Sequence, residues 1–228
     1  MTKKQKTAVA IGSVISIFVG LIILAIIVAV NRKKKLSKKD LMNLVREDVD
    51  YWKGLSETDK KGAEKLKEWW SWLGFNFSID QIMSSVFQSK WYWSAVYISA
   101  LMKRWGAGDR FKYSTSHSEF IIDGKKAREN KDKDSIYWSY RPNEVKVEVG
   151  DIIGKPRKSG ITYDNLYVGA PTHTDIVYDV VKKDNQWYAY IIGGNVGNTV
   201  SIKAVKLDSK KKLENPNKYL VVMKNQVT

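Results

Sequence analysis

Few polar residues in this chain have a type and a position that suit catalysis. The two histidines are His117 and His173, and His173 opens an expected strand that also holds Asp175. Asn195 follows the next expected strand, and Ser94 precedes an apolar run with helical spacing. If the two strands pair, His173 and Asn195 lie at one sheet end, and Ser94 could face them from the positive end of a helix dipole. This is the geometry of a nucleophilic hydrolase.

In such an arrangement Ser94 would be the nucleophile, His173 the general base and Asn195 or Asp175 the group that orients the base, although the spacing alone is a weak signal. His117 is a candidate for an additional acid or ligand. Each residue also has a structural explanation. Ser94 could simply cap its helix, which is the commonest use of serine there. His117 follows the N-cap candidate Ser116, and its role could be simply to pack or to cap the helix.

The remaining candidates carry similar alternatives. His173 could make ordinary hydrogen bonds at a strand end, and Asn195 could serve only a turn between glycines. Asp175 shares a strand face with His173, which does not guarantee contact. Trp91 and Trp93, beside Ser94, could stack on a sugar substrate or pack in the core.

The absence of cysteine excludes a thiolate nucleophile, thiolate metal ligands and disulfides. The two histidines have no ligand cluster with zinc spacing, so the sequence predicts neither a metal nor another cofactor.

Helical periodicity dominates the first half of the region after residue 35, and strand alternation dominates the second half. Helices are expected over residues 36–53, from about residue 56 to 73, 78–87, 94–105 and from 116 onward. Strand candidates follow: residues 136–140, 145–149, 151–154, 174–181, 187–192, 200–205 and 219–223. The expected fold is α+β, with helices packed on an antiparallel sheet.

An uncharged apolar segment, residues 8–30, lies near the N-terminus, with Ser13 and Ser16 as its only polar side chains. A helix of about 20 apolar residues can cross a bilayer, and a cleavable signal peptide has a shorter apolar region. The sequence therefore predicts a single-pass anchor with basic flanks, residues 1–35, before one domain, residues 36–228.

The charge around this segment bears on orientation and partners. Residues 1–35 hold seven of the 39 basic residues and no acid, which leaves a net charge of +8 for residues 36–228. The basic residues after the segment favour a cytoplasmic domain. The excess suits lipid headgroups, an acidic wall polymer or nucleic acid without choosing among them, and the sequence contains no nucleic-acid motif. Nothing in the sequence gives the oligomeric state.

Several motif blocks resemble, in order, the bacterial family called domain of unknown function 2272. The resemblance covers about residues 65 to 207. The blocks are residues 93–99 (WSAVYIS), 106–111 (GAGDRF), 113–117 (YSTSH), 149–153 (VGDII), 172–177 (THTDIV) and 192–196 (IGGNV).

That family is similar in turn to papain-like cell-wall hydrolases of the CHAP and NlpC kind, which cut amide or peptide bonds in peptidoglycan. The resemblance implies a papain-like domain, a peptidoglycan partner and a nucleophile at the position of Ser94. It also implies a base at His173 and a third polar residue near Asn195. The resemblance favours a domain on the cell-wall side of the membrane, whereas the flanking charges favour the cytoplasmic side. A viral membrane is also consistent with the anchor.

Serine in place of cysteine leaves several functions open. Serine cannot rest as an alkoxide, so it would need a general base and an oxyanion hole. The first expectation is an anchored peptidoglycan amidase or peptidase. The alternative is a module on the same fold that binds cell wall or a protein without turnover. A third is a cytoplasmic-facing protein whose basic domain meets acidic lipid or a protein.

Overall fold

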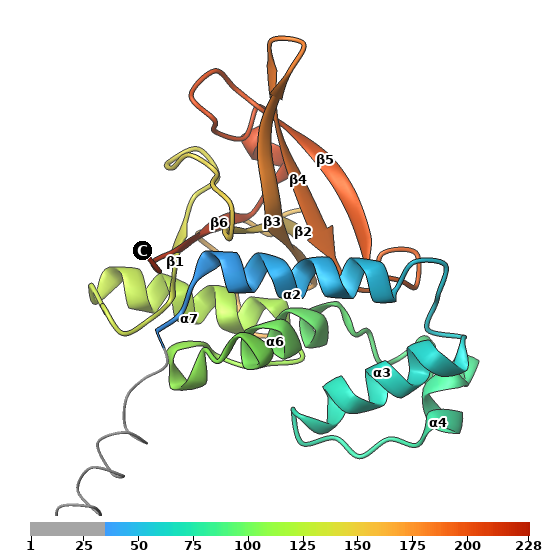
Figure 1. Cartoon of the computed structure of the whole chain (residues 1–228). Helices are drawn as coiled ribbons and strands as arrows, with labels where there is room; N and C mark the ends of the chain where they lie inside the picture. Colours follow the sequence, from blue (N-terminus) through green and yellow to red (C-terminus); the bar gives the residue numbers. More distant parts are fainter. Residues whose placement is uncertain (1–34) are drawn as a thin grey trace, which may run out of the picture. The chain divides into compact units, whose positions relative to one another are not determined.

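The computed structural model describes residues 35–228. The chain divides by its internal contacts between Lys35 and Leu36, and all that follows concerns the second unit, Leu36–Thr228. This unit begins with helices and continues into a sheet, as the change of periodicity predicts (Figure 1).

The first two helices form where the sequence places its amphipathic stripes. Helix α2 is Lys38–Tyr51, and the Ser37 side chain caps it by accepting from the backbone N–H of Asp40. Helix α3 is Lys60–Ser71. Both bury one face, because their large apolar residues recur three or four positions apart.

The next expected helix is split in two. A capping box between Ser78 and Gln81 starts α4, Ile79–Met83. Ser84 then adopts an extended conformation (ψ 140°), and its side chain caps α5, Ser85–Gln88. Two competing serine caps in one short stretch explain why no continuous helix forms.

Two further helices lie against the sheet. Helix α6 is Ser94–Trp105 and ends at Gly106, whose φ of 86° is readily adopted only by glycine. Helix α7 is His117–Glu129. Both contact strand β3, and in Figure 1 they lie together with α2 along one side of the strands.

Six antiparallel strands form a single sheet in the order β1-β6-β2-β3-β4-β5. The strands are β1 Tyr137–Tyr140, β2 Ile152–Pro156, β3 Thr172–Lys183, β4 Gln186–Gly193, β5 Ser201–Leu207 and β6 Val221–Asn225. The short C-terminal strand β6 is inserted between β1 and β2, which the order of strands along the chain does not reveal.

Both faces of the sheet are apolar. Ile152 and Ile176 pack in the main core with the helices, whereas Ile153 and Val177 pack in a second cluster. Since neighbouring residues of a strand point to opposite faces, the second cluster covers the face turned away from the helices. This division of faces decides how the polar residues of β3 are placed.

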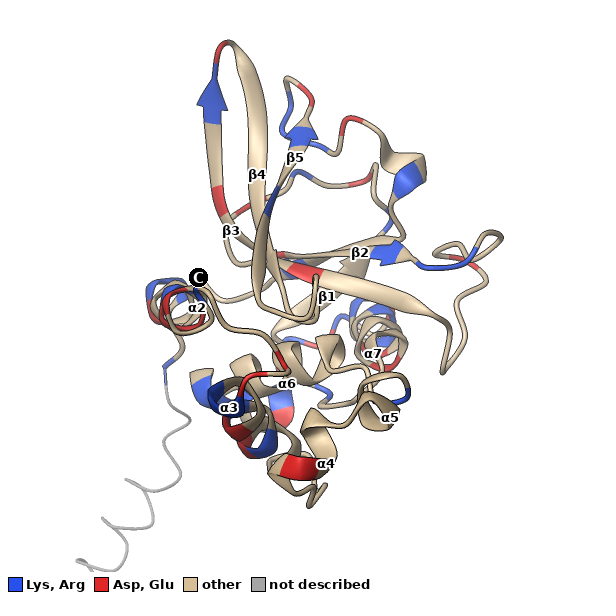
Figure 2. Cartoon of the chain, turned by 90° about the vertical axis from the view of Figure 1, so that its right-hand side faces the viewer, with Lys and Arg blue, Asp and Glu red and all other residues tan. Residues whose placement is uncertain are grey.

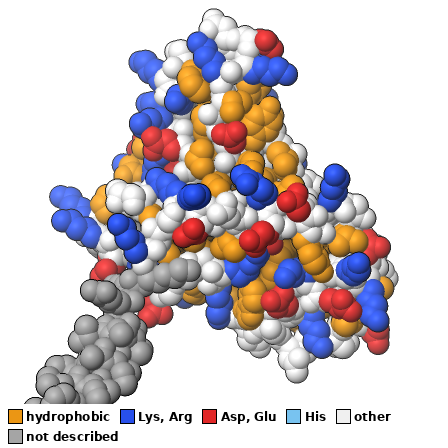
Figure 3. Space-filling model, viewed as in Figure 1, with side chains coloured by type: hydrophobic (Ala, Val, Ile, Leu, Met, Phe, Trp, Pro, Cys, Tyr) orange, Lys and Arg blue, Asp and Glu red, His pale blue; other side chains and the backbone are white. Residues whose placement is uncertain are grey.

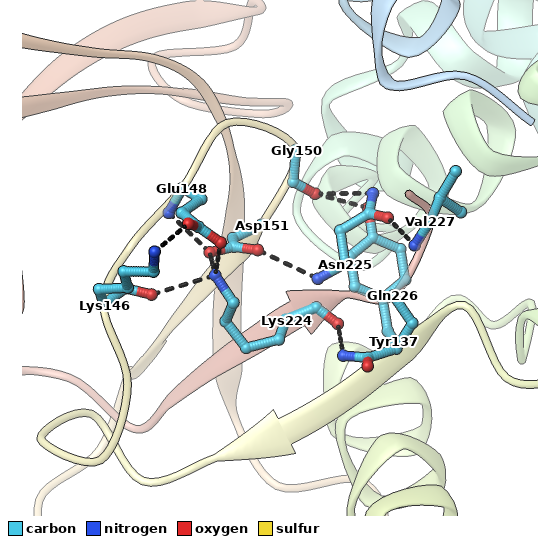
Figure 4. Close-up of polar contacts among 9 residues, drawn as sticks. All are labelled: Tyr137, Lys146, Glu148, Gly150, Asp151, Lys224, Asn225, Gln226 and Val227. Atoms are coloured by element: carbon cyan, nitrogen blue, oxygen red, sulfur yellow. Dashed lines mark hydrogen bonds and ion pairs between the residues drawn. The ribbon is translucent and has the colours of Figure 1, made fainter. Parts of the chain in front are cut away.

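Residues 145–149 were expected to form a strand and do not. They belong to the loop before β2, where side chains take over the backbone groups that a strand would pair (Figure 4). Asp151 accepts from the N–H of Glu148 at 2.7 Å, and Lys224 Nζ donates to the carbonyl of Lys146 at 3.1 Å. Lys224 also donates to Asp151 at 2.6 Å, which ties β6 to the start of β2.

The membrane expectations require correction. The expected transmembrane helix, residues 8–30, lies outside the described residues, and no helix within residues 35–228 has the length and apolar character to cross a bilayer. The fold class is corrected to α+β with an antiparallel sheet and no membrane-spanning helix in the described part. The predicted single-pass localisation therefore has no support from the structure.

On the face seen in Figure 3, the basic side chains are spread among acidic ones and do not form one patch. There, lysine and arginine side chains alternate with acidic ones across α2, and basic side chains also surround the far end of the β3–β4 hairpin. Such interspersion gives no single-sign patch on this face.

Candidate functional site

Ser94 is the first residue of α6, one position further into the helix than a cap. Trp93 is the N-cap residue, and no side chain caps the first amides of the helix. The first backbone N–H groups of a helix have no partner within it and carry partial positive charge. Ser94 is buried, with 4% of its surface exposed.

The Ser94 hydroxyl pairs with His117. The Oγ–Nε2 distance is 2.6 Å, and Nδ1 of His117 lies 2.8 Å from Oγ1 of Thr174. The three side chains come from the start of α6, the start of α7 and the start of β3. The serine hydroxyl, the imidazole and the threonine hydroxyl are thus linked by two consecutive hydrogen bonds.

The alternation of β3 explains why Thr174, rather than His173, faces α6. Thr174 shares its parity with Ile176, which packs in the main core with the helices, whereas His173 shares its parity with Val177, which packs in the second cluster. His173, which the sequence predicts as the base of Ser94, therefore lies on the other face of the strand, and the histidine in contact with Ser94 is His117.

Gly194 lets α6 approach the sheet at this point. A Cβ atom there would lie 2.5 Å from Cβ of Tyr97 and 2.8 Å from Cζ3 of Trp93. No side chain fits in that space, so the glycine is required for the close packing that brings Ser94 to the sheet.

Burial keeps His117 neutral. It lowers the pKa of His117 well below the ordinary value, and the nearby His173 and Arg157 lower that pKa further. A neutral imidazole has one N–H and one acceptor nitrogen. If Nδ1 carries the proton, His117 donates to Thr174 and accepts from Ser94; the other tautomer reverses both bonds.

His173 takes part in a separate set of contacts. Its Nε2 lies 2.9 Å from Oδ1 of Asp175, and its Nδ1 lies 3.0 Å from a terminal nitrogen of Arg157. A guanidinium can only donate, so Nδ1 must accept and Nε2 must carry the proton that goes to Asp175. Asp175 thus contacts the histidine that the sequence indicates as its possible partner, and the carboxylate can lie there because Gly193 opposite has no side chain.

A cavity of about 410 Å³ opens beside the Ser94–His117 pair. Among the described residues, its only charged lining side chain is that of Arg157. The lining residues are Tyr92, Ser94, Thr115, Ser116, His117, Arg157, Gly169, Ala170, Pro171 and Thr172. Tyr92 is 66% exposed, so an apolar surface borders the cavity at its mouth.

Asn195 lies at a second cavity, of about 320 Å³, which His173 and Arg157 also line. It has a φ of 55°, a conformation that asparagine tolerates. Asn195 makes no side-chain hydrogen bond to His173 in the described part of the chain. Its placement fits the turn explanation as well as a role at the second cavity.

Neither tryptophan expected at the substrate lines the cavity at Ser94. Trp93 is fully buried, stacks on Trp52 with ring centroids 5.0 Å apart, and donates to Glu57 at 2.6 Å. Trp91 packs edge-on against Trp70. The aromatic residue at the cavity is Tyr92, which lies between them in the sequence.

Sequence reasoning missed Thr174 and Arg157. Thr174 lies between His173 and Asp175, so strand alternation places its side chain on the opposite face of β3 from theirs. The sequence does not show which of these faces the helices cover. Arg157 lies in a loop among other basic residues and carries no local signal. Residues 35–228 contain no cluster of three or more acidic or histidine side chains that could hold a metal.

Fold and site together define an α+β protein with a buried serine–histidine pair at the start of a helix. The chain belongs to the family described as uncharacterized protein conserved in bacteria (DUF2272), whose model matches residues 47–226. Searches of curated proteins and of solved structures found no match. The comparisons thus establish the bacterial family and give no support for the expected similarity to CHAP and NlpC hydrolases.

Proposed function

We propose that this protein hydrolyses an amide or peptide bond, with Ser94 as nucleophile and His117 as general base. The observation that carries the proposal is the 2.6 Å contact between Ser94 Oγ and His117 Nε2. Such a distance permits direct proton transfer, and a histidine with a lowered pKa is available in its neutral, accepting form.

The proposed reaction has two halves. Ser94 Oγ attacks the carbonyl carbon while its proton passes to His117 Nε2, and the tetrahedral intermediate collapses as His117 returns that proton to the leaving amine. Water then attacks the acyl-serine ester by the same route and releases the acid. The uncapped first amides of α6 are the candidate donors to the oxyanion.

Peptidoglycan is the substrate we propose to test first, and this choice rests on the sequence resemblance alone. The cavity beside Ser94 supports it only in general terms: it is open, bordered by the exposed Tyr92 ring and lined by hydroxyl groups. Aromatic rings and hydroxyls suit a glycopeptide without selecting it.

A binding module without turnover is the second candidate. It is favoured by the neutral side chain, Thr174, that pairs with His117. His117 is supported by the neutral Thr174, while the nearby carboxylate of Asp175 is paired to the other histidine. An imidazolium formed during catalysis would lack the direct carboxylate partner that stabilises it in serine proteases.

The test compares wild-type protein with Ser94→Ala and with Ser99→Ala on purified peptidoglycan, and it measures newly exposed amino groups. Ser99 is a matched control, because it is also buried on α6 but donates to the carbonyl of Ser114 at 2.7 Å. Hydrolysis should fall roughly 10⁴-fold or more in the Ser94 variant and persist in the control.

Equal activity in wild type and Ser94→Ala would refute the nucleophile. A wild type that binds peptidoglycan but releases no amine would establish the binding module instead.

A further inference from the structure

We propose that the second cavity binds an anionic group, a carboxylate or a phosphate, of the ligand that reaches Ser94. Basic residues line it: Lys155, Arg157 and Lys203. No acidic side chain lines it among the described residues, although Asp175 lies behind His173.

These cations are available to a ligand. Arg157 is exposed, has no acidic partner in the described part of the chain, and gives one N–H to His173. A guanidinium carries five N–H donors in a planar fork that matches a carboxylate or phosphate. Lys203 is likewise exposed, with no ion pair among residues 35–228. Within residues 35–228, the Lys155 ammonium has one side-chain contact, with the face of the Tyr219 ring, 5.1 Å away.

The strand pairing places the basic residues of this cavity on one face of the sheet. Lys155 on β2 pairs with His173 on β3, and Lys203 on β5 pairs with Ile191, which belongs to the second cluster. Cross-strand partners share a face, so the lysines and His173 lie on the sheet face turned away from α6. Figure 2 shows basic residues where β2 ends and the next loop begins.

Arg157 connects the two cavities, because it lines both of them. The Ser94 cavity lies on the helix side of the sheet and the second cavity on the other side, with Arg157 just beyond the end of β2. A ligand that spans this edge would place its anionic group at Arg157 and the lysines and its scissile group at Ser94. The inference concerns binding, so it stands or falls separately from hydrolysis.

His173 reports on this binding. An anion that recruits the Arg157 fork competes with Nδ1 of His173 for that guanidinium. The chain has only two histidines, so their imidazole nitrogen NMR signals are easily resolved. A His173→Gln variant assigns the signals. The test titrates full-length Ser94→Ala protein with sodium phosphate and with sodium citrate, against sodium chloride of equal ionic strength.

We expect a saturable shift of the His173 signals with phosphate, citrate or both, and none with chloride. Saturation by only one probe identifies the anionic chemistry. Arg157→Gln should weaken binding roughly tenfold or more, which is followed by calorimetry because that variant also alters the environment of His173. Lys203→Gln should weaken it about two- to fivefold.

Lys206→Gln is the matched control. It lies on the same strand as Lys203, exposed but on the opposite face, so its loss should leave the dissociation constant unchanged. The absence of any saturable shift, or an equal loss in the Lys203 and Lys206 variants, would overturn the proposal. Anion binding by a protein that hydrolyses nothing would support it and reject only the proposed hydrolysis.

Discussion

The hydroxyl of Ser94 lies 2.6 Å from Nε2 of His117, and the second histidine, His173, is bonded to Asp175 instead. The two imidazole rings are close, with centroids 5.3 Å apart, yet they belong to two different hydrogen-bonded chains. This separation gives each histidine a distinct expected role: His117 acts on the serine, and His173 connects Asp175 to Arg157.

Replacing the two histidines should therefore have unequal effects. His117→Gln removes the acceptor of the serine proton and should lower kcat/KM roughly 10⁴-fold, whereas His173→Gln should lower it only about tenfold. The measurement is steady-state hydrolysis of a peptidoglycan-derived amide, with near-ultraviolet circular dichroism to verify packing. A larger loss in the His173 variant would restore His173 as the base and reject the present assignment.

The two histidines should also adopt opposite tautomers. Arg157 and Asp175 require Nε2–H on His173, and a general base facing Ser94 requires Nδ1–H on His117. Long-range correlation of imidazole carbon-bound protons with nitrogen resolves the two patterns in uniformly labelled protein. Nε2–H on both rings would mean that His117 donates to Ser94, which contradicts its role as base in the resting protein.

Stability should depend on pH through His117. Its pKa is lowered in the folded protein from an ordinary value of 6.5, so the unfolded chain binds the proton first as the pH falls. The free energy of unfolding should thus decrease below pH 6.5, by at most about 1.4 kcal/mol per pH unit from this group.

Other buried groups oppose this trend, so the diagnostic quantity is a difference between variants. Burial raises the pKa of Asp48 to about 6, which stabilises the fold as the pH drops below that value. Urea denaturation of wild type and His117→Gln at about pH 7.5 and about pH 5.5 isolates the histidine. Identical pH dependence in the two proteins would show that His117 does not carry a lowered pKa.

The packing of α6 on the sheet should fail when Gly194 acquires a side chain. The Cβ atom of Gly194→Ala would overlap Tyr97, which should cost about 1–3 kcal/mol or more and displace Ser94, so that hydrolysis falls as well. Gly54→Ala is the control. That glycine has open space but a φ of 75°, so it should lose about 1–2 kcal/mol and retain activity. Full activity in Gly194→Ala would show that the contact does not position Ser94.

Local sequence signals predicted much of the fold. Ser37 caps α2 through Asp40, and Ser78 and Gln81 form a capping box, and both motifs are local because they involve residues only three positions apart. The order of helices before strands followed from periodicity for the same reason. Residues 145–149 alternate like a strand, yet contacts from Lys224, distant in sequence, engage their backbone.

The structure brings several of the residues chosen from the sequence close together, but with other partners than expected, and their roles stay predictions. Ser94, His117, His173 and Asp175 were all chosen from their types and their positions at element ends, and each takes part in a polar contact near one of the two cavities. Arg157 carried no local signal, and its importance derives from where β2 ends in space.

By itself, the sequence determined the chemical inventory: a serine at a helix start, two histidines, no thiol, and an α+β order of elements. Only the tertiary structure decided which histidine contacts Ser94. Alternation places His173 and Thr174 on opposite faces of β3, but it does not say which face the helices cover. That choice depends on packing between distant segments, including the close approach of α6 at Gly194.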